Sequence, residues 1–336
     1  MTYSKEFLDA LLLANETYTA DTLLDFKNLP KGIPTTNYTD FVYGSTSNPE
    51  NPFRIEPFEL FLINSKDPNA FAFKHDELYL MIIHISLFSL LENKIKEKVP
   101  RLTGQAAAII SSVETCLPKG LDGQFTMYQF ITLFTYYHEL AHLHQFKHQD
   151  DLGMPSCFEK YCLIEGKEFD QVAHAMEIDA DLFAADQVTK HILKYWEEFA
   201  VEKRTIENLE NLISLVSASI FLFFDELAKG WQNCMYFLDH RHPNPLMRTS
   251  YITDAIANIS ALSQKEGFPK PDPNNCIING FILAEQLLEN EDRNGLNEFA
   301  ELYIDQNHQI GEYVTQMTAF NKTVPFLISN WYNNDV

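Results

Sequence analysis

Hydrophobic and polar residues follow two different periods along this chain. Short apolar runs beside turn residues predict strands at residues 58–64 and 70–74, which we expect to pair as a hairpin or a β-arch. The pattern therefore predicts a mainly α fold (α+β) with a small sheet near residues 55–75. Apolar residues three and four positions apart predict helices over residues 4–28, 78–99, 103–116, 131–148, 167–196, 205–229, 245–264, 276–290, 296–319 and 323–332.

Two proline-rich stretches interrupt this pattern. Residues 29–57 hold five prolines among Gly, Ser, Thr and Asn, which predicts a loop or an extended wrapping segment. Residues 268–275, FPKPDPNN, predict a linker. We therefore divide the chain into an N-terminal helix and extended segment at 1–54, a central domain at 55–265, and a C-terminal helical segment at 266–336.

The helix predicted at 131–148 contains the sequence HELAH. His138 and His142 are four residues apart, so both imidazoles lie on one helix face and can reach one metal ion. Glu139 follows the first histidine and is placed to act on a water molecule at that ion. A chance match on a buried helix stays open, although two histidines and a glutamate buried without partners would be costly.

This helix also has a predicted start and a candidate third ligand. Thr126 and Gln129 predict a capping box before it. His148 follows His138 by ten residues, which is the offset of the third histidine in the metzincin pattern HExxHxxGxxH. That pattern has Gly where this chain has Gln145. We therefore expect the helix to continue and to carry His148 about 15 Å along its axis, to a solvated helix end.

The next predicted helix offers a better third ligand. Within residues 174–185, HAMEIDADLFAA, Glu177 and Asp181 are four apart and share one helix face. Alanines on or near that face let a second helix approach closely. We expect Glu177 to bind the metal and Asp181 to accept a hydrogen bond from a ligand histidine, which fixes its tautomer. An ordinary acidic helix face is the alternative.

HExxH followed by ExxAD resembles the gluzincin metallopeptidases, and within them the branch of the CAAX prenyl protease, the heat-shock protease HtpX and the soluble minigluzincins. Two further segments agree with that branch. Residues 69–72, NAFA, resemble its substrate-binding strand edge, and residues 242–248, HPNPLMR, resemble its HPxxxxR segment. The likeness covers about residues 55–255. The shorter gap between Glu139 and Glu177 resembles, more loosely, the phage-exclusion protease Lit.

The resemblance implies a zincin-like helical domain with an HExxH helix, an ExxAD helix and a small sheet whose edge strand binds substrate. Zn²⁺ is expected to be held by His138, His142 and Glu177, and to lower the pKa of a bound water to about 7. Glu139 would take the proton of that water as general base. The implied function is hydrolysis of peptide bonds.

The remaining site residues are also implied by the resemblance. His242 is the expected donor to the oxyanion of the tetrahedral intermediate. Arg248 is expected to orient Glu177 or another acid of the site by a bidentate contact. The substrate backbone would be held by strand addition at Asn69, Ala70, Phe71 and Ala72.

Other functions remain open alternatives. The chain is also compatible with a zinc-binding regulatory or interaction protein on a protease-like fold, or with a Lit-like phage-exclusion protease. Two histidines and one carboxylate also suit iron in oxygenases. The intact Glu139 favours hydrolysis over the binding-protein and oxygenase alternatives, because only hydrolysis needs a base at this position.

Composition narrows the possible partners. The 336 residues include 47 acidic and 25 basic ones, and this net charge of −22 argues against nucleic acids and anionic membrane surfaces as partners. Five scattered cysteines without a CxxC favour neither a disulfide framework nor a structural zinc site. No apolar run reaches the roughly 20 residues of a membrane span, and we see no signal peptide. We expect a cytoplasmic protein that acts on a peptide or protein; its oligomeric state stays open.

Overall fold

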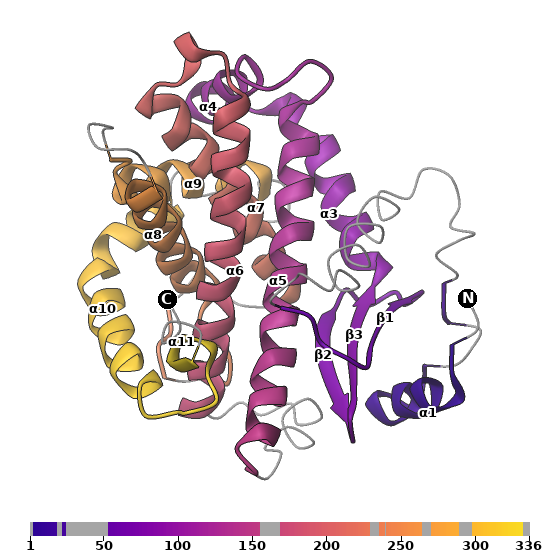
Figure 1. Ribbon diagram of the computed structural model, residues 1–336. Helices are drawn as coiled ribbons and strands as arrows, with labels where there is room; N and C mark the ends of the chain where they lie inside the picture. The colour runs from indigo at the N-terminus through magenta and orange to yellow at the C-terminus, as the bar shows by residue number, and fades with distance from the viewer. Residues whose placement is uncertain are drawn as a thin grey trace.

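A small mixed sheet lies beside a larger bundle of helices (Figure 1). Its strands are β1 (Phe58–Ile63), β2 (Ala70–His75) and β3 (Leu78–His84), in the order β1-β3-β2. β1 runs parallel to β3, and β2 runs antiparallel to it. The predicted strands at 58–64 and 70–74 are therefore present. They do not form a hairpin with each other, because β3 lies between them.

This computed structural model describes residues 3–18, 22–24, 53–154, 169–228, 235–238, 240–263, 270–288 and 298–331. Most of the predicted extended segment at 29–57 and the start of the linker predicted at 268–275 lie outside these ranges, as do three of the five cysteines. The two described cysteines, Cys116 and Cys276, are buried and free.

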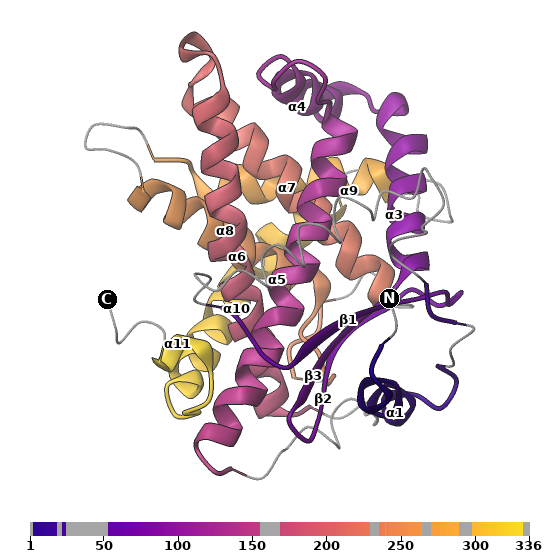
Figure 2. The same cartoon turned by 45° about the vertical axis from the view of Figure 1, so that its right-hand side comes forward.

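The bundle is built from long helices, most of them at the predicted places. α5 and α6 lie side by side at its centre, with α7 against both (Figures 1 and 2). The helices are α1 (Lys5–Ala14), α3 (Ile85–Lys98), α4 (Gly104–Glu114), α5 (Gly123–Asp151), α6 (Gln171–Glu198), α7 (Ile206–Leu227), α8 (Pro245–Ser263), α9 (Pro273–Leu288), α10 (Glu298–Asn321) and α11 (Ile328–Trp331).

β3 corrects the prediction of one helix over residues 78–99, since α3 takes up only the second part of that range. Successive residues of β3 face two different cores. Met81 and Ile83 belong to the main core with the helices, whereas Leu80 and Ile82 lie in a smaller core with α1. A strand that is buried on both faces is apolar at every position, so it resembles the beginning of a buried helix.

α1 is shorter than the helix predicted at 4–28. It ends where Asn15 turns the chain, because the Asn15 side-chain oxygen accepts hydrogen bonds from the backbone N–H and the hydroxyl of Thr17. Farther along, Leu23 forms a β-bridge with Ile63 of β1. Leu23, within the later part of the predicted helix, therefore lies beside the sheet and not in a helix.

α5 carries the HExxH sequence and is buried along most of its length. It begins at Asp122, whose side chain accepts a hydrogen bond from the backbone N–H of Phe125. The predicted capping box of Thr126 and Gln129 is wrong, because Thr126 lies inside the first turn and donates its hydroxyl to the Asp122 carbonyl. Beyond the last turn, Gly153 has a positive φ of 64°, a backbone conformation that terminates helices.

α7 is the central helix of the main core and packs against α5, α8 and α9. By length and composition it is apolar enough to cross a membrane. However, 72% of its most apolar window is buried inside the protein. A core helix of this kind has the same composition as a membrane span, so its place in the core accounts for its apolar residues.

The main core continues into the C-terminal helices. α9 lies closely against α7, and α10 and α11 both contact α6 (Figure 2). Buried residues of this one core extend from Phe53 to Ile328. The domain boundaries at residues 54 and 265 stay a prediction.

Candidate metal centre

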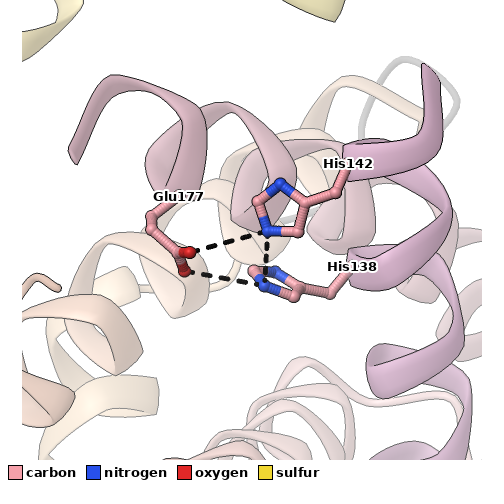
Figure 3. Close-up of side chains that lie close together, drawn as sticks. All are labelled: His138, His142 and Glu177. Atoms are coloured by element: carbon pink, nitrogen blue, oxygen red, sulfur yellow. Dashed lines mark hydrogen bonds and ion pairs between the residues drawn. The ribbon is translucent and has the colours of Figure 1, made fainter. Parts of the chain in front are cut away.

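Three possible metal ligands converge between α5 and α6 (Figure 3). His138 and His142 extend from successive turns of α5, and Glu177 points toward them from α6. The two Nε2 atoms are 3.2 Å apart, and each lies 3.6 Å from a carboxylate oxygen of Glu177. The structure therefore brings the three predicted ligands together in a group that can hold a metal ion.

The second ring nitrogen of each histidine faces an acceptor. Nδ1 of His138 lies 3.0 Å from Oδ1 of Asp181, the acid predicted to lie there. Nδ1 of His142 lies 2.9 Å from Oε1 of Gln145. These acceptors favour the proton on Nδ1 of both rings, which leaves both Nε2 lone pairs directed at the same point.

The separations of the ligand atoms fit a tetrahedral ion. Zinc binds histidine nitrogen and carboxylate oxygen at about 2.0–2.2 Å, which places two tetrahedral ligand atoms about 3.3 Å apart. The observed separations of 3.2 and 3.6 Å lie close to that value. Two lone pairs and a carboxylate that face one point also repel one another unless a metal ion or a proton lies between them. Burial opposes a positive charge on His138, but Asp181 outweighs burial and raises the pKa of that ring, so the site favours a positive charge at this point. The donor set therefore suits a metal ion such as zinc.

Arg248 joins the two acids of α6. Its Nε and Nη2 atoms donate to the two carboxylate oxygens of Asp181 at 2.8 and 2.7 Å, and the hydroxyl of Tyr251 donates to the same carboxylate. Nη2 of Arg248 also lies 2.8 Å from Oε2 of Glu177. The guanidinium carbon is 4.0 Å from the centre of the Phe224 ring. The structure thus places Arg248 on both Asp181 and Glu177.

These contacts keep both acids ionised. Burial acts to raise the pKa of Glu177, but the Arg248 guanidinium, followed by His242, holds that pKa well below its usual range. Burial likewise opposes ionisation of Asp181, and Arg248 again outweighs it and lowers the pKa of that carboxyl. Glu177 is therefore an anion that can bind a cation at neutral pH.

Glu139 is a buried acid of a different kind. It follows the first ligand histidine on α5 and is 4% exposed. Burial raises its pKa to about 7, and the neighbouring His138 and a hydrogen bond from the backbone N–H of Ala72 partly oppose the rise. A carboxyl group with this pKa can both accept and release a proton near neutral pH, as a general base must.

Three of the predicted substrate-binding residues, Ala70, Phe71 and Ala72, lie on β2, at one edge of the sheet and beside α5 (Figure 1), and Asn69 directly precedes that strand. The backbone N–H of His84 on β3 donates to the carbonyl of Asn69. In an antiparallel pair the bonding direction alternates, so Ala70 and Ala72 direct their backbone groups away from β3 and Phe71 directs them toward it. The N–H of Ala72 reaches Glu139 in this way. Edge strand and candidate base are therefore in direct contact.

His242 lies at the solvent side of the site. Its Nδ1 is 3.4 Å from Oε1 of Glu177, and its side chain is 61% exposed. On α6, Nε2 of the buried His174 donates to the carbonyl of His240, while its Nδ1 accepts from the hydroxyl of Tyr313 on α10. His174 thus ties the segment that carries His242 to α6.

His148 does not join the ligand group. α5 continues past Gln145 to Asp151, as expected for a helix without the metzincin glycine. The ring of His148 lies against Trp331 of α11, with the ring centres 5.1 Å apart. Within the described ranges, the third ligand beside the two histidines is Glu177.

Sequence reasoning missed two other residues near the ligands. Gln145 lies three positions after His142, a spacing that places both on one helix face, so the sequence held a signal for this contact. Asp179 accepts a hydrogen bond from the Gln145 amide at 2.9 Å and two more from Ile328 and Ser329. Partners so distant along the chain leave no local pattern by which they could have been found.

The identification of His138, His142 and Glu177 as a candidate metal centre rests on this geometry and on the sequence motifs. No protein-family model matches the chain, and neither the curated proteins nor the solved structures give a match. The likeness to gluzincins therefore depends on the four sequence segments and on the positions of His138, His142 and Glu177.

Proposed function

We propose that this chain is a zinc-dependent metallopeptidase of the gluzincin type, which hydrolyses peptide bonds. The observation that carries the proposal is the convergence of His138, His142 and Glu177 beside Glu139. A metal site alone would serve many purposes. A buried carboxyl group with a pKa of about 7 next to that site is suited to move a proton.

Each residue of the site has a place in the proposed hydrolysis. A bound zinc ion would polarise the peptide carbonyl and lower the pKa of a water molecule. Glu139 removes a proton from the attacking water and returns it to the nitrogen of the leaving amine. His242, on the exposed side, donates a hydrogen bond to the oxygen that becomes negatively charged. Arg248 and Asp181 hold Glu177 and His138 in place.

The substrate is proposed to be an extended peptide. Ala70 and Ala72 direct backbone groups to the outer edge of β2, where a peptide can add as a further strand once it replaces the Asn69 side chain that accepts from the Ala70 N–H. The N–H of Ala72 contacts Glu139, so a peptide on this edge lies close to the candidate base. Binding of this kind reads the peptide backbone, so side-chain preference would come from neighbouring residues.

The test combines metal content with cleavage of an unfolded protein. We expect one zinc ion per wild-type chain, and loss or strong weakening of binding in Glu177→Ala. His148→Ala is the control and should keep its zinc, since its ring lies against Trp331. Glu139→Gln should keep zinc and lose cleavage by a factor of at least about 100, the scale of general-base catalysis.

Three outcomes would contradict the proposal. A wild-type protein that takes up no zinc when supplied with it has no such metal centre. Retention of zinc in Glu177→Ala but loss in His148→Ala would indicate a metzincin-like site. A zinc-loaded protein whose biological effect is unchanged in Glu139→Gln would be a binding module and not a peptidase.

A further inference from the structure

Gln145 has a side-chain orientation that its neighbours determine. Its amide nitrogen Nε2 donates to the carbonyl of Met176 at 3.1 Å and to Oδ2 of Asp179 at 2.9 Å. Both partners are oxygen atoms that accept hydrogen bonds, so the amide group must turn its nitrogen toward them. Its oxygen Oε1 then has to face Nδ1 of His142, which lies 2.9 Å away.

This orientation determines the tautomer of His142. An amide oxygen only accepts, so Nδ1 of His142 must carry the proton and donate it. Nε2 is then left with its lone pair, directed at His138 and Glu177. Gln145 is fully buried, so this contact is shielded from bulk solvent.

Asp179 is held in turn by residues 326–329, called the C-terminal segment below. Its Oδ2 atom accepts from the backbone N–H of Ile328 at 2.8 Å, and Oδ1 accepts from the backbone N–H of Ser329 at 3.0 Å. Phe326 and Leu327, just before them, are buried in the main core and anchor the segment. A continuous chain of hydrogen bonds therefore joins residues 328–329 to His142.

We propose that Gln145 is a positioning residue for His142, and that Asp179 and the backbone of residues 328–329 hold Gln145 in place. The C-terminal segment thereby sets the affinity of the site for its metal ion. This inference rests on the proposed metal site and deepens it. It assigns a role to two residues, Gln145 and Asp179, that bind no metal themselves.

The first test compares two buried glutamines of α5. Gln145→Leu removes the acceptor for His142, whereas Gln149→Leu changes a glutamine one turn farther along that is equally buried. We expect zinc affinity, measured by competition with a chelator, to fall about 10- to 100-fold in Gln145→Leu, as for other outer partners of ligand histidines. Gln149→Leu should stay within about twofold of wild type, because it touches no ligand.

A second readout needs no metal. In the zinc-free protein, ¹⁵N NMR of the histidine rings should show His142 protonated on Nδ1 in wild type and in Gln149→Leu. In Gln145→Leu the ring should populate both tautomers, because its fixed acceptor is gone. A change in folding alone would alter the signals of all buried histidines, including His144 and His174, and not those of His142 alone.

The C-terminal end of the hydrogen-bond chain is tested separately. Ile328→Pro removes the N–H that donates to Asp179. Ile328 is the first residue of α11, a position where proline is tolerated. Ile328→Val shortens the same side chain but keeps the N–H. We expect the zinc affinity of the proline variant to fall about three- to tenfold, which is less than the fall in Gln145→Leu. The zinc affinity of the valine variant should stay unchanged.

The outcomes separate this inference from the proposed function. Suppose that Glu177→Ala loses zinc, while Gln145→Leu keeps the zinc affinity and the His142 tautomer of the wild type. This result would overturn the positioning role of Gln145 and leave the proposed metal centre intact. Absence of zinc from the wild type would overturn the proposed function. The tautomer measurement would then still decide whether Gln145 orients His142. If Ile328→Pro and Ile328→Val changed the zinc affinity equally, the N–H of Ile328 would have no part in holding Gln145.

Discussion

Arg248 balances the charge of the candidate site. It lies 7% exposed between Asp181 and Glu177 and donates to both carboxylates. Its pKa is raised by these two acids against the effect of burial, so it stays a cation. Two carboxylates and one guanidinium leave one negative charge, which favours the binding of a further cation beside Glu177.

Replacing Arg248 with methionine should destabilise the metal-free protein strongly. Two buried carboxylates would lose their partner, and breaking a buried pair in this way costs about 3–5 kcal/mol. The control is Arg101→Met, which removes an exposed pair with Glu97 and should cost about 0.5 kcal/mol or less. Urea unfolding of the two variants without zinc measures both values. A loss below about 1 kcal/mol for Arg248→Met would show that the acids are not ionised together.

At the scale of elements, β2 and α5 meet where Ala72 contacts Glu139. The hydrogen bond from the Ala72 N–H stabilises the ionised carboxylate and so lowers the pKa of Glu139. Without the bond, that pKa rises further above its usual range. Since a general base must be deprotonated, the activity on the acid side of the pH profile should then begin at a higher pH.

Ala72→Pro tests this link between the strand and the base. Proline has no N–H, and Ala72 directs its N–H away from β3, so the sheet itself loses no hydrogen bond. We expect the acid limb of the kcat/KM profile to shift to higher pH in Ala72→Pro and to stay in place in Ala72→Ser, which keeps the N–H. An unshifted limb in the proline variant would mean that Ala72 does not act on Glu139.

The close contact between α7 and α9 depends on Gly280, which has no side chain. A Cβ atom at Gly280 would lie 2.5 Å from Oγ of Ser217 and 3.3 Å from the carbonyl oxygen of Ser214. Both helices are part of the main core, so neither can move away without disturbing other contacts. Glycine at this position therefore allows the two helices to pack closely.

Gly280→Ala should therefore destabilise the protein by about 1–3 kcal/mol, the usual cost of overpacking a core. Gly311→Ala on α10 is the matched control, because a Cβ there meets nothing within 4 Å. That second substitution should stabilise the protein by about 0.5–1 kcal/mol, since alanine favours a helix more than glycine. Thermal or urea unfolding measures both. The same sign of change for both variants would contradict this description of the α7–α9 contact.

At the scale of the whole molecule, a bound ion would join α5 to α6. Both helices belong to one core that extends from Phe53 to Ile328, so the link would stabilise the fold as a unit. An ion that binds only the folded chain adds about 2.7 kcal/mol at a free concentration 100 times its Kd.

Zinc should therefore raise the melting temperature of the wild-type protein by about 4 °C under these conditions, given the entropy of unfolding of a chain this long. Glu177→Ala should show much less of this shift, while Gly311→Ala should show all of it. Differential scanning calorimetry with and without zinc gives the comparison. An equal shift in wild type and Glu177→Ala would place the stabilising zinc at another site.

Local features of this protein could be read from its sequence. The positions of most helices follow from apolar residues three and four apart, and this period is a property of each helix alone. The same rule places His138 with His142, and Glu177 with Asp181, on single helix faces. These pairs have the spacing that the folded structure uses, so the candidate ligands could be named in advance.

Tertiary structure decided the features that join distant parts of the chain. β3 could not be recognised locally, because burial on both faces removed the alternation that marks a strand. The choice of Asp181 as main partner of Arg248 and the contact of Asp179 with residues 328–329 depend on how whole helices pack. Burial also raises the pKa of Glu139. Distances and solvent exclusion between remote segments come from the complete core, so only the folded chain could determine them.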